Sequence, residues 1–133
     1  MSKITYSKED QMIHFESESG NVTSFECRDD FEEGFNSEGV PRESLPVGEY
    51  TANAEIASFG PAYGTFYITT GDDRARDIHG GGSSLPDPYA PRQGWRCTYG
   101  CLRMQNEDGE ALCNLMINDG NNISLTVQQE SYV

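Results

Sequence analysis

DIHGGGSSLPDPYAPRQGWRCTYGCLRM, residues 77–104, is the stretch around which the rest of this chain is arranged. Near its start His79 precedes three glycines, and near its end Cys101 lies between Gly100 and the pair Leu102-Arg103. A thiol nucleophile, an imidazole base and an arginine are side chains with which proteins carry out acyl transfer. The stretch therefore predicts a cysteine-dependent enzyme whose reacting residues lie at the two ends of one long loop.

The segments on either side of this stretch predict a mainly β domain. Apolar and polar residues alternate in short runs separated by turn residues, which is typical of strands. The expected strands, beginning with a three-strand meander, are residues 4–6, 12–15, 22–27, 49–57, 64–70 and 123–127. Only after Cys101 does the period change, because Asn106 has the character of an N-cap and apolar residues at helical spacing predict one helix over about residues 107–117. With 133 residues and no linker or repeat, we expect a single domain over residues 1–133.

Two features of the N-terminal half have both a structural and a functional interpretation. The acidic segment 28–44 has no sustained period, which indicates a long loop. Phe31 and Phe35 either pin this loop down or line a substrate groove. His14 lies in an expected strand with no Cys, Asp or His at ligand spacing, so we interpret it as a surface or cross-strand residue.

The charge of the chain argues against several classes of partner. Asp and Glu outnumber Lys and Arg by 22 to 9, and the net charge of -13 repels nucleic acid and anionic lipids. The first ten residues, MSKITYSKED, lack the apolar run of a secretory signal, and no stretch approaches the ~20 apolar residues of a membrane span. We therefore expect synthesis in the cytoplasm, no insertion into a membrane, and export only by a specialised machinery.

The four cysteines do not have the spacing of a zinc site or the setting of a disulfide framework. Cys97 and Cys101 are four positions apart, and no second pair or histidine completes a set of metal ligands. We expect no metal, a free and reactive Cys101, and buried thiols at Cys27 and Cys113, which lie in apolar contexts. A regulatory disulfide between Cys97 and Cys101 stays open.

The expected chemistry follows from the residues next to the thiol and the imidazole. His79 favours the thiolate form of Cys101, and the glycines at 80–82 let a backbone carbonyl accept the other ring N–H, so that no carboxylate is needed as third member. Gly100 allows close approach of backbone N–H groups to a developing oxyanion, and Thr98 supplies a hydroxyl nearby. Arg103 binds a substrate carboxylate as a fork or supports the thiolate.

These residues resemble the catalytic motif of the L,D-transpeptidase (YkuD-like) family, a His-Gly followed after a gap by Ser/Thr-x-Gly-Cys-x-Arg/Asn. The matching segments are His79-Gly80 and TYGCLR at residues 98–103, and PVGEY at residues 46–50 is similar to the family's Pro-x-Gly-x-Tyr segment. Many members have His at the position of Tyr99 and Ser at that of Thr98. The resemblance spans at least residues 45–103.

The resemblance implies a twisted β-sandwich with one short helix after the nucleophile, and an enzyme that acts on peptidoglycan stem peptides without a cofactor. It makes Cys101 the nucleophile, His79 the base and the carbonyl of Gly80 the group that orients the histidine. The thiol attacks the carbonyl of the L-centre of a diamino acid, expels the terminal D-amino acid and passes the acyl group to water or an amine. The oxyanion and substrate-binding residues are expected to be Gly100, Thr98, Tyr99, Arg103 and Trp95.

A second resemblance concerns the biological setting. The short chain and its IHGGG form are similar to L,D-transpeptidase-fold effectors of type VI secretion, which are antibacterial toxins injected into the periplasm of a competitor. Those proteins act as L,D-carboxypeptidases or exchange the terminal D-Ala of tetrapeptide stems. An immunity protein and a secretion machinery are the further partners that this resemblance implies.

Other interpretations of the same residues stay open. Trp95 and Tyr89 either wall the substrate groove or pack the loop onto the sheet. Arg74, Arg76 and Arg92 are either solvated charges or recognise substrate carboxylates. For the whole chain, an acidic non-enzymatic binding or immunity-type protein is the alternative that needs no reactive thiol, and a metal-binding domain that uses Cys97, Cys101 and a histidine is a third hypothesis.

Overall fold

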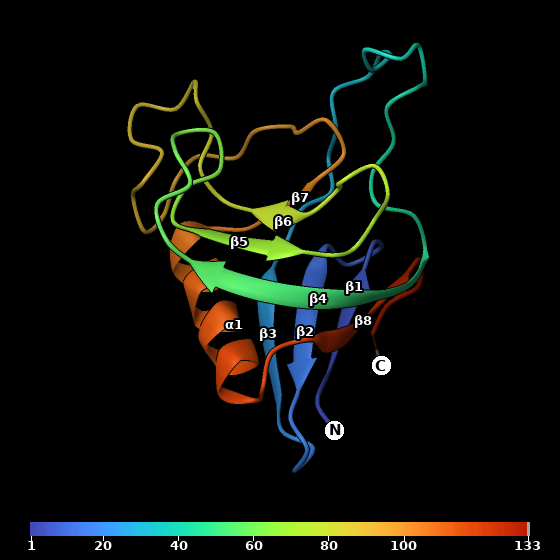
Figure 1. The fold of residues 1–133 in the computed structure, drawn as a ribbon, viewed down its shortest axis with the longest axis vertical. Coiled ribbons are helices and arrows are strands. Elements are labelled where there is room, and N and C mark those ends of the chain that lie inside the picture. Colours follow the sequence, from blue (N-terminus) through green and yellow to red (C-terminus); the bar gives the residue numbers. More distant parts are fainter. Residues whose placement is uncertain (133) are drawn as a thin grey trace.

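The computed structural model describes residues 1–132, in which eight strands form one mixed sheet with a single long helix against it (Figure 1). Along the sheet the strands follow the order β3-β2-β1-β8-β4-β5-β6-β7. Their bounds are β1 Lys3–Ser7, β2 Met12–Glu16, β3 Val22–Glu26, β4 Gly48–Ile56, β5 Phe66–Thr69, β6 Ile78–His79, β7 Leu102–Arg103 and β8 Ile123–Gln128, and helix α1 spans Asn106–Asn118. The mainly β fold with one helix after Cys101 is thereby confirmed.

The first half of the sheet is the expected meander, in which β1 pairs antiparallel with β2, and β2 with β3. Side chains alternate between the two faces of a strand, and the apolar ones of β1 and β2 turn toward the core, with Ile4, Tyr6 and Ile13 almost completely buried. His14 is the predicted cross-strand residue, since its Nδ1 lies 2.6 Å from Ser24 Oγ on β3. It is more buried than a surface position, because Tyr132 stacks on its ring.

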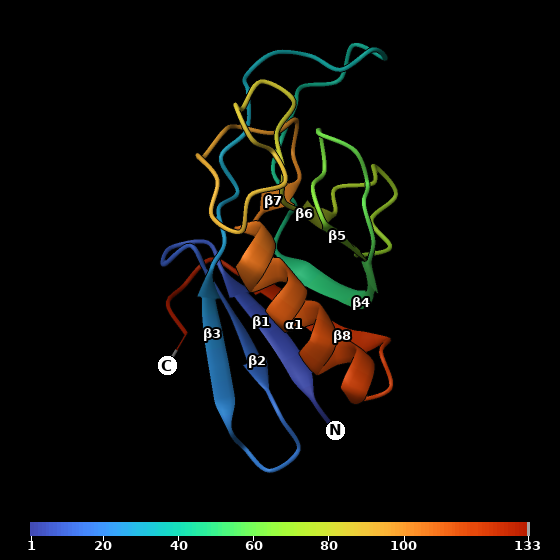
Figure 2. The same ribbon diagram turned by 90° about the vertical axis from the view of Figure 1, so that its left-hand side faces the viewer.

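Strand β4 joins this half to the half that carries the candidate site. Its first residues, 48–52, pair with β8, whereas its last residues, 53–56, pair with β5. Because one strand takes part in both halves, the sheet curls into a half-barrel, and β3, β2 and β1 run crosswise to β4 and β5 (Figures 1 and 2). The long loops gather at one end of this half-barrel, above β6 and β7 (Figure 2).

Helix α1 begins one residue earlier than the capping pattern predicts. Gln105 occupies the N-cap position without a side-chain cap hydrogen bond, and Asn106 is the first helical residue, so the interpretation of Asn106 as N-cap is wrong. The helix buries Leu112, Cys113 and Met116 and packs against β4 and β5. Acidic residues in the first turn favour this end electrostatically.

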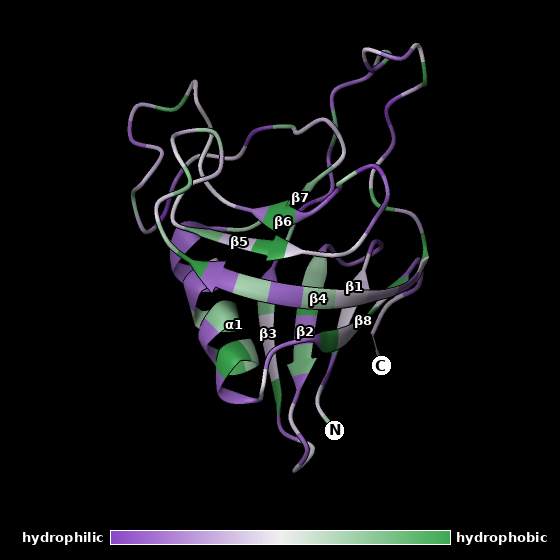
Figure 3. Cartoon of the chain, viewed as in Figure 1, coloured by the Kyte–Doolittle hydropathy of each residue, from purple (hydrophilic) through white to green (hydrophobic). Residues whose placement is uncertain are grey.

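Two short strands, β6 and β7, bring the two predicted motifs side by side. They run parallel, with His79 opposite Arg103 and Ile78 opposite Leu102. The apolar residues of β5 and β6 lie in the core beneath loops that are largely polar (Figure 3). Among residues 1–132, no helix combines the length and the apolar character that crossing a membrane requires.

Gly109 on α1 leads to a first prediction. Alanine in a helix is normally more stable than glycine by about 1 kcal/mol. Here a Cβ at residue 109 would collide with the ring of Phe66, which is fully buried on β5. We therefore expect Gly109→Ala to lower the free energy of unfolding, by about 1–3 kcal/mol for overpacking. Denaturant melts of Gly109→Ala, Phe66→Leu and the double variant measure the coupling, and additive losses would contradict the collision.

Candidate active site

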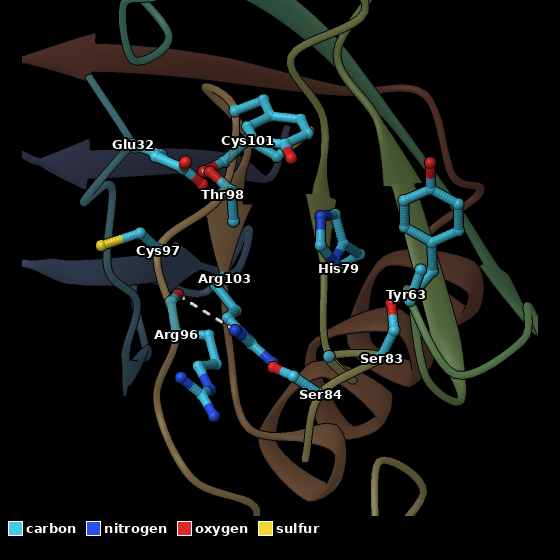
Figure 4. Close-up of a pocket in the computed structure, with 13 residues that line it drawn as sticks. Glu32, Tyr63, His79, Ser83, Ser84, Arg96, Cys97, Thr98, Cys101 and Arg103 are labelled. Atoms are coloured by element: carbon cyan, nitrogen blue, oxygen red, sulfur yellow. Dashed lines mark hydrogen bonds between the residues drawn. The ribbon is translucent and has the colours of Figure 1, made fainter. Parts of the chain in front are cut away.

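His79 and Cys101 line the same cleft, which has a volume of about 400 Å³ and opens at the loop end of the sheet (Figure 4). The two residues are 22 positions apart in the chain and come together because β6 and β7 are neighbours. Arg103, two residues after the thiol, lies in the wall of the same cleft. The other lining residues are Glu32, Ala62, Tyr63, Gly82, Ser83, Ser84, Arg96, Cys97, Thr98 and Tyr99.

The ring of His79 is fixed by its own neighbours. Its Nδ1 lies 2.8 Å from the carbonyl oxygen of Gly80, and this geometry assigns the ring proton to Nδ1, which donates, and leaves Nε2 as the basic nitrogen. Tyr63 meets the ring edge-on with centroids 4.9 Å apart. Burial lowers the pKa of His79 to about 4, an effect that the bond to Gly80 opposes and the positive charge of Arg103 reinforces. The imidazole is therefore neutral near pH 7 and able to accept a proton.

Cys101 lies immediately before β7, and its thiol donates a 3.7 Å hydrogen bond to the carbonyl of Ala75. No hydrogen bond joins the thiol to His79 within the described chain. Burial raises the pKa of Cys101 above its ordinary value; the backbone of Asp77 opposes this through a hydrogen bond, whereas the carboxylate of Asp77 adds to it. The resting pair is thus a neutral thiol and a neutral imidazole, and a proton could pass between them only if the thiol turned from Ala75 toward Nε2.

The neutral resting pair predicts the pH dependence of alkylation at Cys101. Because only the thiolate reacts, the rate constant for iodoacetamide is expected to rise with pH beyond the ordinary thiol pKa of about 8.5. Mass spectrometry of the peptide that contains Cys101 gives the rate at each pH, and the exposed Cys97 in the same protein serves as the internal comparison. A plateau already reached near neutral pH would mean a preformed thiolate and contradict this description.

The guanidinium of Arg103 is buried and only partly satisfied. Its Nη1 donates to the carbonyl of Arg96 at 3.0 Å, whereas Nε and Nη2 have no hydrogen-bond partner among the described residues. Gly82 makes room for it, because a side chain at that position would collide with the guanidinium. Burial lowers the pKa of Arg103 to about 10, which still leaves it protonated at neutral pH. A buried cation with free donors in a cleft is suited to bind an anionic group.

The segment between Thr98 and Cys101 forms a tight turn that engages the expected oxyanion groups. The hydroxyl of Thr98 donates to the carbonyl of Cys101 at 2.7 Å and accepts the N–H of Gly100 at 3.1 Å. The hydroxyl of Thr98 and the N–H of Gly100 are therefore already hydrogen-bonded to other groups of the turn. The N–H of Cys101 makes no hydrogen bond within residues 1–132. Gly100 has a φ of 135°, which a side chain rarely tolerates, and a Cβ there would also meet the carbonyl of Glu43.

The structure separates the other sequence-predicted residues into those in the cleft and those outside it. Tyr99 lines the cleft, with the guanidinium of Arg42 over its ring. Trp95 does not line it and instead packs against Arg28, at 4.2 Å from the guanidinium carbon to the ring centroid. The arginines considered for carboxylate recognition also lie elsewhere: Arg76 pairs with Asp72, Arg92 with Asp108, and Arg74 donates to Pro41.

Sequence reasoning missed several lining residues because they come from separate segments. Glu32 belongs to the loop 28–44, Tyr63 to the turn before β5, and Ser83, Ser84 and Arg96 to the loop between the two motifs. No spacing rule links these segments. Of the aromatic residues considered for the loop 28–44, Phe31 pairs with Thr98 through its backbone, whereas Phe35 is 65% exposed.

The cysteines of the described chain are all free. Cys27 and Cys113 are fully buried, as predicted, and Cys97 is exposed. Burial raises the pKa of both buried thiols, so they are poor nucleophiles. Across residues 1–132, no three His, Cys, Asp or Glu side chains are placed so that they could hold a metal ion.

The curled sheet, the single helix and the cleft at its loop end define an L,D-transpeptidase-like fold. The helical cell shape determining protein Pgp2 from Campylobacter jejuni superposes with a TM-score of 0.64 over 99% of this chain and 49% of its own, at 16% sequence identity. An L,D-transpeptidase from Xylanimonas cellulosilytica gives a TM-score of 0.57 over 96% of this chain and 60% of its own, at 16% identity. The chain thus spans about half the length of the first of these proteins. No protein-family model and no curated protein matches the sequence.

Proposed function

We propose that this protein is a cysteine-dependent enzyme that removes or exchanges the terminal D-amino acid of peptidoglycan tetrapeptide stems. The observation that carries the proposal is the meeting of Cys101, a neutral His79 and the buried Arg103 in one cleft. The likeness of the fold to an L,D-transpeptidase supports the same class of reaction. The catalytic roles come from the motif and from this arrangement.

The reaction begins when Nε2 of His79 takes the proton of Cys101 and the sulfur attacks the carbonyl carbon of the diamino acid residue. The carbonyl π electrons move to the oxygen, which becomes an oxyanion beside the N–H of Cys101. Collapse of this intermediate breaks the C–N bond to the terminal residue, whose amine takes the proton from His79. Water or an amine then attacks the thioester, His79 again accepts a proton, and the thiol is regenerated.

Arg103 provides a site for the terminal carboxylate of the peptide. Its free Nε and Nη2 donors are suited to a two-pronged hydrogen bond with a carboxylate. The same interaction would satisfy two buried donors that have no partner among the described residues, and a buried donor without a partner is unfavourable. A substrate with a free C-terminal carboxylate is therefore favoured over one with a C-terminal amide.

Mass spectrometry of muropeptides tests the proposal directly. Incubation with the protein is expected to convert disaccharide tetrapeptides into tripeptides, or into stems that end in another D-amino acid when one is added. Unchanged muropeptides, together with no covalent adduct at Cys101, would overturn the proposal and favour the acidic non-enzymatic binding protein.

The setting as an antibacterial effector of type VI secretion rests on the sequence resemblance alone. It implies that the protein acts in the periplasm of a target cell and that an immunity protein neutralises it. Growth of a Gram-negative host that expresses the protein with an added periplasmic signal, compared with the same host expressing it in the cytoplasm, tests this setting. Growth inhibition by the periplasmic form alone supports the role as an effector, and equal growth with both forms argues against that role.

A further inference from the structure

We infer that Glu32 determines the specificity of this cleft by receiving a primary ammonium group of the substrate. The inference rests on the proposed function. It adds that the cleft also recognises a positive charge on the substrate. Glu32 lies on the acidic loop 28–44, outside both segments that carry the motif resemblance, residues 77–104 and 46–50.

The backbone beneath Glu32 is fixed to the segment that carries the thiol. The N–H of Glu32 donates to the carbonyl of Thr98 at 2.8 Å, and the N–H of Thr98 donates to the carbonyl of Asp30 at 3.1 Å. Further back, Arg28 and Arg103 exchange backbone hydrogen bonds at 2.9 and 2.8 Å. These bonds fix the backbone of Glu32 beside Thr98, which is three positions before Cys101 in the chain.

The carboxylate of Glu32 is available for a ligand. Its side chain is 64% exposed, and the nearest cation, Arg42, lies 4.0 Å away, at the limit of an ion pair. The guanidinium of Arg42 instead lies over the ring of Tyr99, 4.1 Å from its centroid. No hydrogen bond from another described side chain reaches this carboxylate.

The two charged ends of the cleft are separated. Figure 4 shows Glu32 beside Thr98 and Cys101 at one end of the wall, and Arg96 and Arg103 toward the other end. A ligand that matches both ends carries an anionic group at Arg103 and a cationic group near Glu32. A stem peptide with a C-terminal carboxylate and a diamino acid has both charges, since the second amino group of that residue is protonated at neutral pH.

Two ammonium groups have the chemistry that Glu32 would bind. One is the side-chain ammonium of the acyl donor, and the other is the amino group of an incoming acceptor, which binds as the ammonium and must lose its proton before it attacks. Because the carboxylate is largely exposed, its contribution is modest, and we expect about a 5-fold effect on kcat/KM.

Hydrolysis of tetrapeptides with a free or an N-acetylated side-chain amine, and amine exchange with a D-amino acid, are to be measured for wild type, Glu32→Gln and Glu33→Gln. Glu33 is an exposed neighbour that does not line the cleft, so its variant is the matched control. If Glu32→Gln, but not Glu33→Gln, loses the preference for the free side-chain amine, Glu32 binds the ammonium of the acyl donor. If Glu32→Gln instead lowers only the ratio of exchange to hydrolysis, Glu32 binds the ammonium of the acceptor. Wild-type activity that Glu32→Gln leaves unchanged on every substrate would overturn the inference. Wild type inactive on all substrates would instead overturn the proposed function.

Discussion

Cys101→Ala is expected to abolish release of the terminal D-amino acid from tetrapeptide stems, with kcat/KM lowered by roughly four orders of magnitude or more. The variant removes the sulfur that forms the acyl bond in the proposed mechanism. Cys97 lines the same cleft, but it is exposed and lies outside the pairing of β6 with β7 that brings His79 next to the segment of Cys101. Quantification of tripeptide and tetrapeptide muropeptides by mass spectrometry measures the loss.

Cys97→Ala is the matched control, because it removes a thiol from the same cleft without touching the proposed nucleophile. It is expected to keep activity within about 3-fold of wild type, in line with a surface substitution. Circular dichroism of both variants should match wild type. If Cys101→Ala keeps its activity while Cys97→Ala loses it, the nucleophile has been assigned to the wrong thiol.

Asn106→Ala is expected to lower the free energy of unfolding by about 2–4 kcal/mol, a large loss for one polar side chain. The side chain is completely buried, and its Nδ2 donates to the carbonyls of Pro88 and Ala90 at 2.9 and 2.8 Å. Its Oδ1 accepts the N–H of Thr65 at 3.3 Å. Alanine leaves all three backbone groups without this partner and creates a small cavity between two site loops.

Asn114→Ala provides the comparison for this effect, since Asn114 is an exposed residue of the same helix. Alanine has the higher helix propensity, so this variant should be as stable as wild type or slightly more stable. Urea melts give both free energies, and proteolysis within the loop 83–96 should become faster only in Asn106→Ala. Equal stability of the two variants would show that water replaces the amide at no cost.

Much of the scaffold follows from the pattern of residues along the chain. Alternation in the segments 4–6, 12–15 and 22–27 predicts the three-strand meander, and it is confirmed because those side chains have one buried and one open face. The strand and helix ends differ by one or two residues from expectation. Asn106 is the instructive error, because the residue type that favours an N-cap also satisfies buried loop carbonyls, and only the packing of α1 against that loop decides between these uses.

The sequence by itself determined the mainly β fold, the single helix and the two motifs around His79 and Cys101, because each depends on local periodicity or on close neighbours in the chain. Only the tertiary structure decided the composition of the cleft. Glu32, Tyr63 and Arg96 line the cleft although the sequence did not indicate them, and Trp95 does not line it although the sequence did. The guanidinium of Arg103 is buried and keeps donors without a partner. The physical reason is that the curl of the sheet and the pairing of β6 with β7 bring loops that are distant in the sequence to one end of the sheet. Contacts between these loops depend on how the strands pair and not on the spacing of residues along the chain.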